Sequence, residues 1–136
     1  MGAWGVGIFD NDDACDWKYG LEKTSDLRVV EAAIAAVNVG EDGYVEAPSA
    51  SEALAACEVI ARLKGNWGAR NSYTETLDKW VEAHPMTPGP QLVASAMRVI
   101  DRILAANSEL LELWKDSEEY EDWLKAVQDL RQRVLA

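Results

Sequence analysis

Residues 1–17 read MGAWGVGIFDNDDACDW and join an apolar, glycine-containing segment to an acidic run. Glycine allows positive φ angles and close backbone approach, so residues 1–9 are expected to be extended or turned, not helical. Asp10 or Asn11 is a natural N-cap, and the acids that follow fall in a first helical turn, where the helix dipole favours negative charge. The pattern predicts an extended N-terminal segment that packs on the body of the protein and leads into a helix.

Three aromatic residues of this stretch, Trp4, Phe9 and Trp17, are the expected structural anchors. Large aromatic side chains dominate burial where they occur. Trp4 and Phe9 belong to the non-helical segment and are expected to fill a groove between helices. Trp17 shares a helical face with Ala14 and Leu21. We therefore expect the opening residues to act as scaffold.

Most of the remaining chain shows apolar side chains at three- and four-residue spacing, which marks a buried helical face. The stripe is clearest at residues 27–37, 92–104 and 120–134. Residues 49–64 are apolar on more than one face and rich in alanine, which predicts a central helix with close neighbours.

Two stretches have the capping-box pattern, in which Ser precedes Glu by three residues: Ser49 with Glu52, and Ser72 with Glu75. Each serine is expected to be the N-cap of a helix. No convincing alternation of apolar and polar residues indicates a strand. The sequence therefore predicts an all-α fold, a compact bundle of about six or seven short-to-medium helices. A single helical domain is expected over residues 1–136.

The charge of the chain is strongly acidic, with 24 Asp and Glu against 13 Lys and Arg and a formal net charge of -11. Such a balance disfavours nucleic acids and anionic membrane surfaces as partners, because both require Lys and Arg. No apolar run is long enough to cross a bilayer, and we expect a cytoplasmic protein. Cys15 and Cys57 are expected to be reduced thiols. An acidic surface is compatible with a basic protein partner, with cation binding, or with solubility alone.

Residues 1–17 also resemble the opening signature of the bacterial domain-of-unknown-function 4259 family (DUF4259), Met-Gly-x-Trp-Gly-x-Gly-x-Phe followed by an Asp/Asn-rich run. A second match is the alanine-rich stretch SEALAACEVIA at residues 51–61, and a weaker one is SELLELW at residues 108–114. The resemblance implies a small cytoplasmic bacterial protein. It implies no activity and no catalytic or binding residue.

The candidate binding residues are the aspartates of the acidic run: Asp10, Asp12, Asp13 and Asp16. Hard cations bind several oxygens, and on a helix Asp12 and Asp16 share a face. The spacing is not that of an EF-hand loop, and acids in a first helical turn are common without any ligand. A protein-binding acidic patch is the other functional interpretation.

Two functional hypotheses follow from these features. The first is a non-enzymatic protein-binding or adaptor module, immunity-like or inhibitor-like, whose acidic surface engages a basic protein. The alternative is a small divalent-metal-dependent hydrolase that uses the N-terminal Asp cluster. A third option is a homo-oligomer with an exposed tryptophan patch as its interface. We expect no cofactor and assign no catalytic residue. The single histidine, His84, has no Cys, Ser or second His near it in the sequence, which disfavours a catalytic or zinc-binding role.

Overall fold

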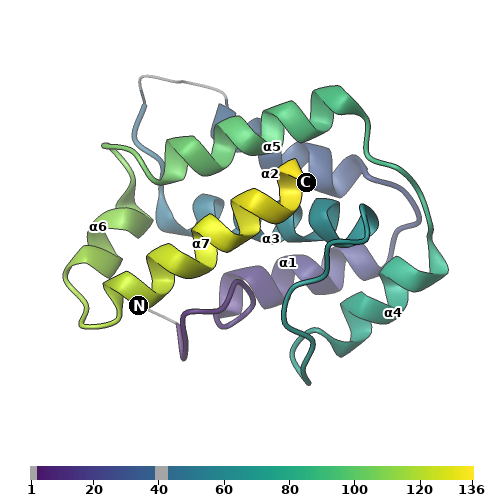
Figure 1. Ribbon diagram of the computed structural model, residues 1–136, viewed down its shortest axis with the longest axis horizontal. Coiled ribbons are helices and arrows are strands. Elements are labelled where there is room, and N and C mark those ends of the chain that lie inside the picture. The colour runs from purple at the N-terminus through teal and green to yellow at the C-terminus, as the bar shows by residue number, and fades with distance from the viewer. Residues whose placement is uncertain (1–2, 39–42) are drawn as a thin grey trace.

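The computed structural model describes residues 3–38 and 43–136, so Met1 and Gly2 of the opening signature lie outside the described residues. The fold is all-α, as predicted, and the described residues form seven helices and no strand (Figure 1). The helices are α1 (Asp12–Glu22), α2 (Arg28–Asn38), α3 (Ala47–Leu63), α4 (Glu75–Ala83), α5 (Pro90–Ile103), α6 (Glu109–Lys115) and α7 (Tyr120–Leu135). In the described part of the chain, none of the helices combines the length and the apolarity that crossing a bilayer requires.

Helix α3 lies at the centre of the bundle, as its apolar composition predicts. It contacts each of the other helices, and every residue from 53 to 62 is buried. Its alanines leave room for neighbouring backbones to approach closely. The remaining helices turn their apolar stripes toward it or toward each other, for example through Ile34 of α2, Val99 of α5 and Val127 of α7.

The predicted N-cap of α3 is wrong, because the helix begins at Ala47 rather than after Ser49. Pro48 fits the first helical turn, where its missing N–H costs nothing. Glu46 is the N-cap but makes no capping bond with its side chain. The cap comes instead from α6, where Glu109 Oε1 accepts a hydrogen bond of 2.7 Å from the Ala47 N–H.

The second predicted capping box is also wrong, because α4 begins at Glu75 and its N-cap is Thr74, not Ser72. Ser72 is exposed in a turn that precedes the helix. The Thr74 hydroxyl accepts from the Asn71 N–H at 3.0 Å and donates to Asp78 at 2.9 Å. It therefore closes the turn and contacts a side chain within the helix instead of capping the helix backbone.

Helices α1 and α4 run side by side in the same direction. Lys18 Nζ of α1 donates to Thr76 Oγ1 of α4 at 2.9 Å. Further toward the C-termini, Trp80 Nε1 of α4 donates at 2.7 Å to the carbonyl of Thr24, just beyond the end of α1. The two helices are therefore parallel (Figure 1). The N-terminal ends of α1 and α4 consequently lie at the same end of the molecule.

Candidate functional site

Asp10 holds the N-terminal segment in a tight turn before α1. Its carboxylate accepts a hydrogen bond of 3.0 Å from the Gly7 N–H, and its carbonyl accepts one of 2.9 Å from the Trp4 N–H. A Cβ atom added at Gly5 or Gly7 would lie 2.5 or 2.6 Å from Asp10 Oδ2. The two glycines therefore leave room for the Asp10 carboxylate. That carboxylate stabilises the turn through its bond to the Gly7 N–H.

The start of α1 follows the prediction closely. Asn11 is the N-cap, and its Oδ1 accepts a hydrogen bond of 2.8 Å from the Ala14 N–H. Asp12 and Asp13 occupy the first turn, where the positive end of the helix dipole stabilises their carboxylates. Asp16 lies one turn further along, and all three of these aspartates are exposed.

The aspartates of the acidic run point in different directions. Burial raises the pKa of the Cys15 thiol; the nearby Lys18 ammonium opposes that increase, whereas the carboxylates of Asp12, Asp16 and Asp10 add to it. Asp13 instead faces α3, where partial burial and the Asp13 charge raise the pKa of Glu52. Residues 3–38 and 43–136 contain no group of three or more His, Cys, Asp or Glu arranged to hold a metal ion.

Two of the three expected anchors are packed against the core. Phe9 is 3% exposed and belongs to the core, and Trp17 is partly buried against it. The expectation for Trp4 was wrong, because this indole is 48% exposed and does not fill a groove. The reason is local: at the short bridge that Ala3 forms, neighbouring side chains point to opposite sides. Ala3 pairs with Asn11 and faces a small cavity, so Trp4 points away from that cavity.

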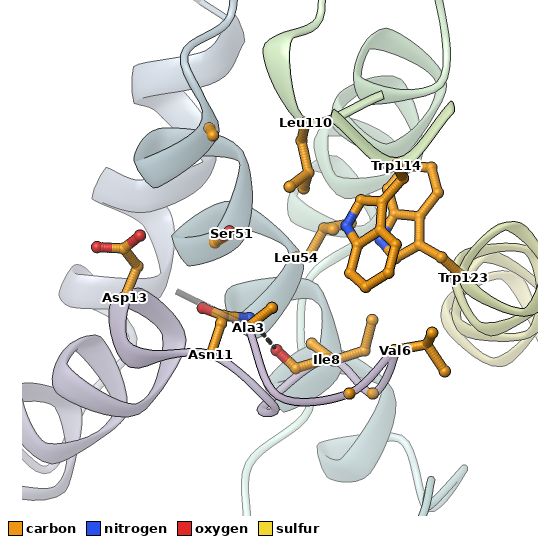
Figure 2. Close-up of a pocket in the computed structure, with 13 residues that line it drawn as sticks. Ala3, Val6, Ile8, Asn11, Asp13, Ser51, Leu54, Leu110, Trp114 and Trp123 are labelled. Carbon is orange, nitrogen blue, oxygen red and sulfur yellow. Dashed lines mark hydrogen bonds between the residues drawn. The ribbon is translucent and has the colours of Figure 1, made fainter. Parts of the chain in front are cut away.

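The cavity beside Ala3 has a volume of about 40 Å³ and lies between the N-terminal segment and helices α3, α6 and α7. Figure 2 shows the indole rings of Trp114 and Trp123 on one side of it, with Val6 and Ile8 nearby. The two indoles stack with their ring centroids 5.9 Å apart. A space of this size holds about one water molecule, whereas small-molecule pockets measure roughly 300–1,000 Å³. This region is a packing contact for the N-terminal segment.

Trp4 instead contacts Tyr73, which precedes α4. Their ring centroids are 5.4 Å apart at an interplanar angle of 42°. Tyr73 is 47% exposed, so both rings keep about half of their surface in solvent. The aromatic pair, Trp4 with Tyr73, thus connects the N-terminal end of α1 to that of α4.

A buried ion cluster, which the sequence pattern did not reveal, lies where α3, α4 and α7 meet; it consists of Glu58, Arg62, Asp78 and Arg133. Arg62 is 1% exposed, and its Nε donates to Asp78 Oδ1 at 2.9 Å. Arg62 Nη1 lies 3.1 Å from Glu58 Oε1 but makes no directed hydrogen bond. Arg133 of α7 pairs with both Glu58 oxygens. Two positive and two negative charges therefore balance in the interior, as buried charges require.

This ion cluster fixes the connection between α3 and α4, which carries Tyr73. Arg62 Nη2 donates to the Ala69 carbonyl at 2.7 Å. A Cβ atom added at Gly68 would lie 2.6 Å from Glu58 Oε1. The Arg70 guanidinium lies 4.2 Å from the centroid of Trp67. The backbone of the connection therefore packs directly against the ion cluster.

The only sequence signal for this cluster is Glu58 with Arg62, a pair at i,i+4 in a helix that is otherwise apolar. Such pairs are common on solvated helix faces. Here the apolar residues on every side show that the pair has to be buried, and a buried pair needs further partners. Those partners, Asp78 and Arg133, are distant in the sequence and could not be chosen from it.

Comparison with known proteins gives one match. The model of the family described as Domain of unknown function (DUF4259) matches residues 2–126. The chain belongs to this family. No match was found among curated proteins or among solved structures. The family description assigns no activity, so the function of this DUF4259 protein has to be argued from its surface and its chemistry.

The described surface of the DUF4259 fold offers binding groups around the start of α1. Asp12 and Asp16 present exposed carboxylates, and the aromatic pair presents two half-exposed ring faces. His84 lies at the other end of α4, where Nδ1 is 2.8 Å from the Trp80 carbonyl oxygen and the imidazole stacks on the Trp80 indole. Carboxylates and ring faces together can bind a positively charged organic group.

Proposed function

We propose that this DUF4259 protein is a non-enzymatic binding or adaptor module whose acidic surface engages a basic protein. The observation that carries the proposal is the distribution of ion pairs. Asp12, Asp13 and Asp16 are exposed, yet none takes part in an ion pair within the described residues. Seven of the thirteen Lys and Arg side chains form ion pairs in the described residues, and all of these are with other acids, for example Glu58, Asp78 and Asp101.

A second group of acids supports the same surface. The residues that open α7 are exposed, and they too have no ion pair in the described part of the chain: Glu118, Glu119, Glu121 and Asp122. Helix α7 begins beside the N-terminal segment, because Trp123 lines the same small cavity as Ala3 and Val6 (Figures 1 and 2). We call these four residues, together with Asp12 and Asp16, the acidic face.

Unpaired carboxylates on one face create a negative potential that attracts Lys and Arg side chains and speeds association with a basic partner. An immunity-like or inhibitor-like protein that covers a basic surface is one form of this proposal. The net charge of -11 and the fixed turn before α1 both support it, since a preorganised surface loses little entropy on binding.

The proposal is tested by affinity capture from the native host at low and high salt. We expect the wild-type chain to capture a basic protein at low salt and to release it at high salt, because salt screens exposed charges. The double variant Asp12→Asn/Asp16→Asn should capture much less of it. The matched control Glu31→Gln/Glu46→Gln also removes two exposed carboxylates, neither of which belongs to the acidic face, and should capture as well as wild type.

Two results would reject the proposal. One is the recovery of no basic protein at low salt, where electrostatic attraction is strongest. The other is equal capture by the two double variants, which would show that total charge matters and the acidic face does not.

A further inference from the structure

The aromatic pair is unusual for its exposure. Trp4 and Tyr73 leave 48% and 47% of their surface in solvent although their rings contact each other. The stacked pair Trp114 and Trp123, by contrast, is 5% and 3% exposed. Exposed Trp and Tyr on a surface are the residue types that most often dominate binding energy at protein interfaces. We propose that the aromatic pair is the anchor of the acidic face and binds an arginine or lysine side chain of the basic partner, an inference that rests on the proposed function.

Both rings extend from fixed backbone. Trp4 is held by its N–H bond to the Asp10 carbonyl, at 2.9 Å, inside the turn that Asp10 closes. The Tyr73 N–H donates to Asn71 Oδ1 at 2.9 Å. The connection that contains Tyr73 is in turn tied to the buried ion cluster through Ala69. A ring that is already in place loses little conformational freedom when a partner binds.

Exposed carboxylates lie close to both members of the pair in the sequence. The Trp4 backbone is bonded to Asp10, two residues before the exposed Asp12. Glu75, in the first turn of α4, is two residues after Tyr73; it is also exposed, in a solvent-exposed pair with Lys79 at 3.4 Å. An apolar side chain docked on the pair would have to desolvate neighbouring carboxylates without pairing them, which is costly. A cationic side chain pairs with those carboxylates while it contacts the rings.

The same chain already contains a contact of this kind. The Arg70 guanidinium lies 4.2 Å from the centroid of the Trp67 ring, and its Nη2 donates to Glu82 Oε1 at 2.7 Å. An indole face and a carboxylate thus hold one guanidinium between them. Trp4, Tyr73 and the acids around them offer these groups to a guanidinium or ammonium from outside.

The experiment measures the binding of a fluorescently labelled peptide of alternating arginine and glycine to the full chain. Its counterpart with citrulline in place of arginine keeps the shape and loses the charge. We expect the arginine peptide to bind and the citrulline peptide not to bind. Trp4→Leu and Tyr73→Ala should each weaken the arginine peptide by roughly tenfold, whereas Trp4→Phe, which keeps a ring face, should retain most of the affinity.

The matched control is Leu135→Ala, which removes another large exposed side chain, at the end of α7. Tyr73→Ala leaves the N-terminal turn intact, so a loss shared by Trp4→Leu and Tyr73→Ala points to the pair and not to misfolding. Thermal unfolding of each variant confirms that the chain is folded.

The results separate the two proposals. If the arginine peptide binds and Asp12→Asn/Asp16→Asn weakens it, but the aromatic variants match Leu135→Ala, then the pair is not the anchor and the proposed function survives. If a peptide of alternating leucine and glycine binds as tightly as the arginine peptide, the assignment of a cationic side chain is overturned. If no basic peptide binds at low salt, the inference falls together with the acidic binding face.

Discussion

At the scale of single residues, the carboxylate of Asp10 determines what its neighbours can be. Gly5 and Gly7 surround it so closely that neither position has room for a Cβ atom. From the sequence, residues 1–9 were expected to be extended or turned, and Asp10 was a candidate N-cap and one of several candidate binding acids. Its role in the turn could not be foreseen, because it depends on how the backbone folds back over residues 3–10.

We expect Gly7→Ala to destabilise the protein, since the new Cβ atom would lie 2.6 Å from Asp10 Oδ2 and displace a carboxylate that accepts a backbone hydrogen bond. Loss of that bond costs about 1 kcal/mol. The double variant Gly7→Ala/Asp10→Ala should cost less than the sum of the single variants, because removal of the carboxylate relieves the clash. Chemical unfolding measures these free energies.

The control is Gly20→Ala in α1, where an added Cβ atom meets nothing within 4 Å. This change should raise the free energy of unfolding by roughly 0.5–1 kcal/mol, because alanine favours the helix. Strict additivity in the Gly7/Asp10 double variant would contradict the proposed turn.

The thiol of Cys15 reports the charge around the start of α1. Burial and the carboxylates of Asp12, Asp16 and Asp10 raise its pKa, so less thiolate is present at a given pH and alkylation is slowed. The variant Asp12→Asn/Asp16→Asn should lower that pKa and speed alkylation of Cys15 by iodoacetamide at pH 8. Mass spectrometry measures the rate, and Glu31→Gln/Glu46→Gln is the matched control. An unchanged rate in the first variant would show that these carboxylates do not act on the thiol.

At the scale of helices, apolar spacing predicted the existence of the elements better than their ends. The stripe at residues 92–104 became α5 and that at residues 120–134 became α7. The starts of α3 and α4 were missed for a shared reason. In neither helix does the serine of the capping-box pattern cap the first turn. The cap of α3 is a glutamate 62 residues further along the chain, and no local pattern indicates such a partner.

Glu109→Ala should therefore destabilise α3, although Glu109 belongs to α6. Loss of the carboxylate that accepts from the Ala47 N–H should lower the free energy of unfolding by about 1 kcal/mol, a typical value for a helix cap. Glu109→Gln keeps an acceptor oxygen and should cost less. Glu118→Ala, at an exposed acid without an ion pair in the described structure, is the control and should have little effect. Equal stability of the two alanine variants in urea unfolding would argue against the cap.

The buried ion cluster gives a stronger prediction for the junction of α3, α4 and α7. Arg62→Met leaves Glu58 and Asp78 buried without their central partner, and such a loss costs roughly 3–5 kcal/mol. Arg131→Met breaks an exposed pair with Asp101 and should cost about 0–1 kcal/mol. Thermal and chemical unfolding would measure both, and similar losses would show that the cluster is not a buried network.

At the scale of the whole molecule, composition predicted an acidic, helical protein, and the fold confirms the helices. The candidate site was predicted only in part. The acids at the start of α1 were identified, but the exposure of Trp4 was missed because its direction depends on the pairing of Ala3 with Asn11. Tyr73 was missed because nothing in the sequence indicates that α1 and α4 begin at the same end.

Charge also bears on self-association. A net charge of -11 should keep two acidic faces apart at low salt, so we expect size-exclusion chromatography with light scattering to show a monomer there. If the aromatic pair could hold two copies together, a dimer would grow as added salt screens the repulsion. A dimer that is already present at low salt and is lost on Trp4→Leu would favour the homo-oligomer hypothesis over a basic partner.

The pairing of Glu58 with Arg133 spans 75 residues of sequence. During synthesis this contact can form only after α7 has been made, although Tyr73 leaves the ribosome much earlier. We therefore expect a chain that stops before Arg133 to leave Glu58 without this partner and to hold the connection that carries Tyr73 less firmly.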